Sequence, residues 1–118
     1  MAPTKEDILA AGEEAIANQS REKAEAYRKA TAGMGEEERK KYELREGGDY
    51  DRWGKKCGCS AEEFRKTTWE MVKTDEDVRA GMIKVLESGN KYRTDEEQEG
   101  VAKLIEMLSW LSGAGEKK

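Results

Sequence analysis

The residues best suited to chemistry in this sequence are two cysteines, Cys57 and Cys59, separated by one glycine. Lys55 and Lys56 precede them, and positive charge favours the thiolate form of cysteine. A helix beginning at Ser60 would bring its positive end close to both sulfurs. This pattern is compatible with a thiol redox or metal-responsive pair. Because one intervening residue closes a tight, strained ring, we interpret both as incidental loop thiols and keep the redox or metal-responsive pair as the alternative.

Histidine is absent from the chain. This excludes Ser-His-Asp and Cys-His nucleophile systems as well as imidazole metal ligands. Two thiolates supply only half of a tetrahedral zinc site. Acid pairs such as Glu62-Glu63 and Glu96-Glu97 lie in the first turns of predicted helices, where capping explains them. We therefore expect no catalytic residues, no metal and no cofactor.

The segment from Asp49 to Gly54 resembles the first half of a calcium loop, with acids at positions one and three and glycine at six. Its fifth position is Trp53 and its twelfth is Ser60, where a bidentate glutamate is required, so calcium is excluded. We interpret 49–60 as a loop. Its aromatic and basic side chains could grip a nucleic-acid base or a peptide, or could anchor the loop on the protein. These candidate contact residues are Tyr50, Arg52, Trp53, Lys55 and Lys56.

The charge balance argues against a nucleic-acid partner. The chain holds 22 basic and 26 acidic side chains, a net charge of −4, whereas nucleic-acid-binding domains are commonly basic. Residues 39–56 form the only basic stretch, with seven basic and four acidic residues. A solvated surface explains this stretch most simply, and contact with phosphate or with an acidic protein are the alternatives.

Helix-start and glycine signals divide the chain into four parts. Thr4 precedes a predicted N-terminal helix over 5–31, with a loosely packed second half. Residues 33–59 form a polar, glycine-containing connector with a short helix. Residues 60–112 are predicted to form a compact three-helix core, and 113–118 a disordered tail. The three predicted core helices span 61–73, 75–88 and 95–112, with start signals at Ser60, Thr74 and Thr94.

No stretch alternates with the period of two that a strand requires, so the fold class is all-α. Residues 64–111 hold 17 of the 27 large apolar side chains in the chain. We therefore expect one small helical bundle of four to five helices, in which the helix at 5–31 docks on the C-terminal core.

The last predicted helix has more apolar surface than one contact requires. At 100° per residue its apolar positions cover roughly 220° of the circumference, whereas a surface helix needs a stripe of about 100°. Either the helix has neighbours on two sides, or part of its surface binds a partner. In the second case the candidate partner-binding residues are Met107, Trp110 and Leu111.

With 118 residues, mean hydropathy −1.02 and no long apolar run, the chain is expected to be one intracellular, cytoplasmic domain without a membrane span. The function we expect is a non-enzymatic protein–protein interaction or assembly module that binds a protein partner, or itself, through the last helix. The alternative is a thiol redox or metal-handling protein that uses the cysteine loop. A weaker alternative is a nucleic-acid-associated factor that uses residues 39–56.

Overall fold

The computed structural model describes residues 2–116, and their side chains as far as Ser112. The described residues are mostly helical and contain no strand, which confirms the all-α class. It has seven α-helices rather than the expected four or five. They are α1 (Lys5–Ala17), α2 (Arg21–Thr31), α3 (Glu36–Glu43), α4 (Asp49–Cys57), α5 (Ala61–Thr74), α6 (Glu76–Ser88) and α7 (Asp95–Glu116), with a short 3-10 helix, η1 (Asn90–Tyr92), before α7. None of the described helices is long and apolar enough to cross a membrane.

Side-chain caps begin α1, α5 and α7 at the predicted residues, whereas α6 is capped by Asp75 rather than by Thr74, which is the last residue of α5. Thr4 and Asp7 form a reciprocal capping box at α1, and Thr94 with Glu97 forms another at α7. The Ser60 hydroxyl accepts from the Glu63 backbone N–H at 3.0 Å. These caps satisfy backbone donors that the first helical turn leaves free.

The predicted single helix over 5–31 is wrong, because the helix ends at Ala17 and a second helix begins at Arg21. The Ser20 hydroxyl accepts from the Lys23 N–H at 3.1 Å and so begins a new helix. Gln19 holds the turn against α6: its side chain donates to the Val85 carbonyl and accepts from the Ser88 hydroxyl. The second segment, α2, buries only Thr31.

The interpretation of 49–60 as a loop is also wrong, because Asp49–Cys57 is helix α4. Acids lie in its first turn and lysines in its last, the order that a helix dipole favours. Gly58 ends the helix with φ of +80°, a left-handed conformation in which glycine avoids the strain of a Cβ.

The hydrophobic core is small and extends beyond 60–112, because α1 and α4 pack on it as well. Its buried apolar residues come from α1, α5, α6 and α7, and Tyr50 and Trp53 of α4 pack against them. Phe64 and Val72 of α5 are the largest fully buried side chains. The buried members are Ile8, Ala11, Phe64, Val72, Val78 and Leu108.

Arg79 of α6 is buried because its guanidinium donates to free backbone carbonyls at the end of α5. Its guanidinium donates to the carbonyls of Val72 and Lys73 and to the Ser112 hydroxyl, each at 3.0 Å. One side chain thereby joins α5, α6 and α7, and its charge is surrounded by acceptors.

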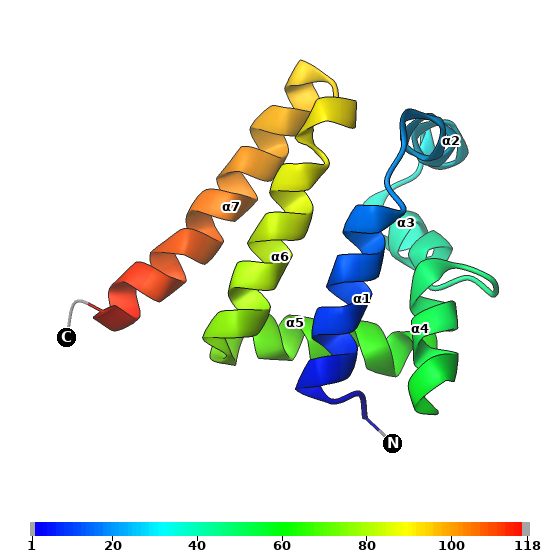
Figure 1. Ribbon diagram of the computed structural model, residues 1–118. Helices are drawn as coiled ribbons and strands as arrows, with labels where there is room; N and C mark the ends of the chain where they lie inside the picture. Colours follow the sequence, from blue (N-terminus) through cyan, green and yellow to red (C-terminus); the bar gives the residue numbers. More distant parts are fainter. Residues whose placement is uncertain (1, 117–118) are drawn as a thin grey trace.

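Figure 1 shows α7, α6 and α1 side by side, with α7 at one edge of the molecule and α5 crossing at the foot of α6 and α1. The most extensive packing is between α4 and α5, between α1 and α6, and between α5 and α6. The last helix packs on α6 and continues to Glu116, past its predicted end at 112. Of the predicted tail, residues 117 and 118 lie outside the described residues.

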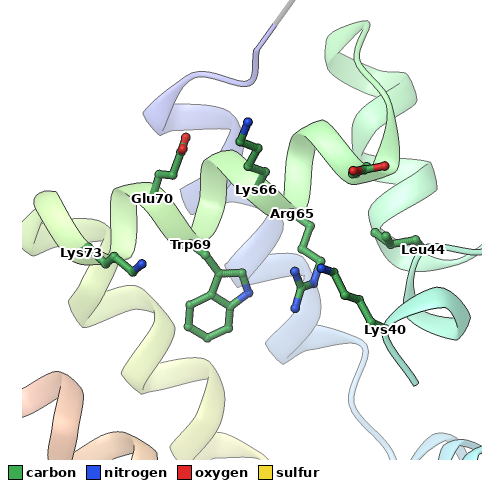
Figure 2. A pocket seen from close by; sticks show the side chains of 8 residues that line it. Lys40, Leu44, Arg65, Lys66, Trp69, Glu70 and Lys73 are labelled. Atoms are coloured by element: carbon green, nitrogen blue, oxygen red, sulfur yellow. The ribbon is translucent and has the colours of Figure 1, made fainter. Parts of the chain in front are cut away.

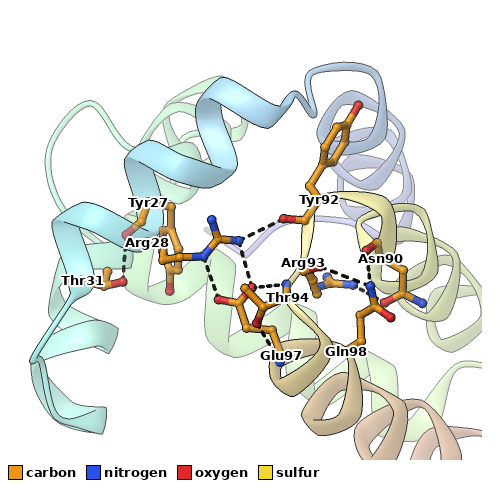
Figure 3. Close-up of polar contacts among 9 residues, drawn as sticks. All are labelled: Tyr27, Arg28, Thr31, Asn90, Tyr92, Arg93, Thr94, Glu97 and Gln98. Atoms are coloured by element: carbon orange, nitrogen blue, oxygen red, sulfur yellow. Dashed lines mark hydrogen bonds and ion pairs between the residues drawn. The ribbon is translucent and has the colours of Figure 1, made fainter.

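Helices α2 and α3 form an arm held mainly by polar contacts. Arg28 of α2 donates to both carboxylate oxygens of Glu97, at 2.9 and 3.1 Å, and to the Tyr92 carbonyl (Figure 3). Tyr27 of α2 meets Tyr42 of α3 edge to face, with ring centroids 6.0 Å apart. Within this arm, Arg28 attaches α2 to the start of α7, and Tyr27 attaches α2 to α3.

Candidate functional site

The outer side of α7 carries the most exposed large apolar side chains of the described residues. Met107 is 56% exposed and Trp110 is 67% exposed. Lys103 and Glu106 lie beside them and line the same shallow surface depression. We call these four residues the α7 outer face. Residues three and four apart share one side of a helix, so the face is continuous along α7.

Leu111, the third predicted partner-binding residue, lies elsewhere. It is half-buried and packs against the hydrophobic core, as does Leu104. Leu108, which lies between these two leucines in the sequence, is buried. The wide apolar arc of α7 therefore divides into an inner stripe that meets the core and an outer stripe that the described residues leave uncovered.

The two cysteines lie together at the junction of α4 and α5. Their sulfurs are 3.0 Å apart, both thiols are free, and both side chains are half-buried. Burial, together with the hydrogen bond and charge of Cys57, raises the pKa of the Cys59 thiol to about 11. The expectation that neighbouring lysines favour the thiolate is therefore wrong for Cys59.

The aromatic residues of α4 face inward. Tyr50 and Trp53 pack edge to face with ring centroids 5.5 Å apart, and Trp53 lies 5.8 Å from the ring of Phe64. Burial raises the pKa of Tyr50 above its ordinary value. These two rings anchor α4 on the core, as one of the two interpretations of 49–60 predicts; the other is contact with a nucleic-acid base or a peptide.

The basic residues of α4 form ion pairs within the chain. Lys55 pairs with Asp51 at 3.1 Å. Lys56 and Arg52 both reach Glu14 of α1, at 3.2 and 3.3 Å, and the Trp53 indole N–H donates to the same carboxylate. We call this group the Glu14 cluster. It lowers the pKa of Glu14 to about 2, with the Trp53 hydrogen bond as the largest cause.

A groove between α3 and α5 is a candidate site that the sequence analysis missed. It has a volume of about 280 Å³. Trp69 and Leu44 supply its apolar surface, and four basic and two acidic side chains surround them. The lining residues are Lys40, Leu44, Glu62, Arg65, Lys66, Trp69, Glu70 and Lys73. The sequence signal for it is the spacing of Arg65, Trp69 and Lys73, each four residues apart on one side of α5.

Within the described residues, no three side chains of the metal-ligating types gather where they could share an ion. Comparison of the chain with protein families, with curated proteins and with solved structures finds no match. Assignment of a function therefore depends on the geometry of the three regions above: the α7 outer face, the cysteine pair and the α3–α5 groove.

Proposed function

We propose that this protein is a non-enzymatic interaction module that associates with a second copy of itself through the α7 outer face. The observation that carries the proposal is the exposure of Trp110 and Met107, one turn apart on the edge helix of the molecule. Tryptophan is enriched at the energetic centres of protein interfaces, and methionine repacks readily against a partner.

The charges on the face favour a second copy over an unrelated protein. Lys103 and Glu106 carry opposite charges on one stripe. In an antiparallel pair of α7 helices, Lys103 of each copy approaches Glu106 and Trp110 of the other, which gives two ion pairs and two cation–π contacts related by a two-fold axis. Met107 lies near that axis. The small area predicts a weak, concentration-dependent dimer.

A charge-swap series measured by sedimentation velocity, from about 10 μM to about 1 mM, tests this arrangement. Wild type should shift toward the dimer mass as concentration rises, and Trp110→Ser should remain monomeric. Lys103→Glu and Glu106→Lys should each weaken the dimer because each places like charges opposite one another. The double variant Lys103→Glu/Glu106→Lys should restore it.

Lys84→Glu, at an exposed position of α6, is the matched control for the change of charge. It should leave the dimer unchanged. A wild-type protein that stays monomeric at the highest concentration overturns the proposal. A double variant as weak as either single variant shows that the face does not pair with its own copy.

Thiol redox chemistry at Cys57 and Cys59 is the second candidate function. The 3.0 Å sulfur contact supports it, since the thiols need little movement to react. The raised pKa of Cys59 keeps this thiol protonated at neutral pH, so Cys59 is not the attacking thiolate of such a pair. A nucleic-acid role for 39–56 gains less support, since Arg52, Lys55 and Lys56 are paired with carboxylates of the chain.

A further inference from the structure

We infer that the α3–α5 groove binds a small aromatic phosphate of the nucleoside monophosphate class. This site is separate from the α7 outer face, and its ligand is independent of the proposed self-association. The inference depends on three features of the groove: an arginine with unused donors, an aromatic surface beside it, and a positive balance of charge.

Arg65 supplies the unused donors. Its side chain is 28% exposed, and its Nε is fully buried without a hydrogen-bond partner among the described residues. The nearest carboxylate oxygen belongs to Glu43, 3.9 Å away, which is an ion-pair distance rather than a hydrogen bond. The other oxygen of that carboxylate accepts from the Tyr27 hydroxyl at 3.1 Å. The Nε itself is closed to solvent, so an entering phosphate oxygen would accept hydrogen bonds from the exposed terminal nitrogens of the same guanidinium, which lines the groove.

Trp69 supplies the aromatic surface. Figure 2 shows its indole extending from α5 into the groove, with Arg65 on one side and Lys73 on the other. Lys40 reaches in from α3 on the Arg65 side (Figure 2). All nucleic-acid bases can stack on a tryptophan ring, while arginine and lysine hold the attached phosphate.

Size and charge define the ligand class. The four basic and two acidic side chains of the lining leave a net charge of about +2, which complements a phosphate monoester at neutral pH. A volume of about 280 Å³ lies just below the range of about 300–1,000 Å³ that is typical of ligand sites, so it suits at most one nucleotide rather than a strand. We therefore assign the groove to a free nucleotide and not to a nucleic acid.

Adenosine monophosphate is the probe, and the indole N–H signals of Trp53, Trp69 and Trp110 in a nitrogen–proton correlation spectrum are the readout. The Trp69 signal, assigned by its loss in Trp69→Phe, should shift saturably while the other two move little. Arg65→Gln should weaken the nucleotide about tenfold or more, and Lys40→Gln should weaken it less. Arg21→Gln, which removes an exposed arginine of α2, is the matched control and should bind like wild type.

The remaining outcomes each decide the inference. Lys40 is exposed on α3, so Lys40→Gln keeps the test valid if Arg65→Gln fails to fold. Absence of a Trp69 shift at millimolar nucleotide overturns the inference. Binding of inorganic phosphate as tight as that of the nucleotide also overturns the inference, because the aromatic contact would then contribute nothing to the affinity. A short oligonucleotide that binds more tightly than the monophosphate would assign the groove to nucleic acid instead.

Discussion

At the scale of single residues, Glu14 is the side chain on which most contacts between α1 and α4 depend. Three donors from α4 converge on its carboxylate, from Arg52, Trp53 and Lys56. Charge-assisted hydrogen bonds are stronger than neutral ones, and the indole is a donor that must be satisfied when half-buried. Glu14 therefore orients the tryptophan that packs on Phe64.

The lowered pKa of Glu14 predicts sensitivity to acid. Its pKa is 4.5 ordinarily and about 2 in the folded protein. The stabilisation is complete above pH 4.5 and is lost as the pH falls toward 2, because the folded state must then take up a proton that the unfolded state already holds. Glu14→Gln should lower the melting temperature at pH 7 by about 3–6 °C and flatten its fall between pH 4.5 and 2.

Thermal melts followed by circular dichroism at several pH values measure both effects. Glu13→Gln, at the exposed neighbouring position, is the control and should keep the wild-type profile. Identical profiles for Glu14→Gln and wild type would show that the cluster contributes nothing to stability.

At the scale of elements, the tight turn between α4 and α5 depends on Gly54. A Cβ at this position would lie 2.7 Å from the Cys59 carbonyl oxygen and 3.0 Å from Ser60 backbone atoms. The Cys59 N–H also donates to the Gly54 carbonyl at 2.9 Å. The absence of a side chain therefore allows the chain to turn directly from α4 onto α5.

Two glycine substitutions should have opposite effects on stability. Gly54→Ala should destabilise the protein by about 1–3 kcal/mol, because backbone atoms must move to admit the methyl group. Gly100→Ala in α7, where nothing lies within 4 Å of the added atom, should stabilise it by about 0.5–1 kcal/mol. Urea unfolding curves measure both, and equal effects at the two sites would contradict the argument.

The sequence predicts α5, α6 and most of α7 well, because strong caps and a dense apolar pattern coincide there. It fails at α4, although Tyr50, Trp53 and Cys57 recur at helical spacing. The calcium-like acids and glycines of that segment are also typical of a loop, and local signals cannot decide between the two. The prediction also misses the break at Ser20: the hydroxyl of Ser20 caps α2 locally, but the contact of Gln19 with α6 that holds the turn has no local signal.

The candidate sites also differ in how far the local sequence predicts them. Exposure of Met107 and Trp110 follows from the excess apolar arc of one helix, which a single sequence displays. The α3–α5 groove needs Lys40 beside Arg65, two residues whose proximity depends on the fold of the arm. Glu14 likewise has no local signal, because its three partners lie about forty positions further along the chain.

At the scale of the whole molecule, the protein is more open than a compact domain of its length. Its radius of gyration is 14.6 Å, whereas about 13.5 Å is typical for this number of residues. The arm of α2 and α3 accounts for part of this, since α2 buries only Thr31 and α3 buries no residue. Its attachment depends on the pair between Arg28 and Glu97.

Native-state hydrogen exchange should therefore resolve two levels of stability. Amides of α2 and α3 should exchange well before those of α5 and α6, because local opening of the arm exposes little apolar surface. Arg28→Ala should speed exchange in α2 by roughly two- to fivefold and leave α5 and α6 unchanged. Arg21→Ala is the control on the same helix, and uniform acceleration across all helices would show that the arm belongs to the cooperative core.

The pairing of α1 with α6 has a consequence for synthesis of the chain on the ribosome. The partner surface for Ile8 and Ala11 comes largely from a helix that begins at Glu76, almost sixty residues after α1 ends. At about 5–20 residues per second, that helix follows α1 by roughly 3–12 seconds. During this interval the apolar side of α1 is a nascent segment without its native cover, and a chaperone that recognises short apolar helices would have time to bind it.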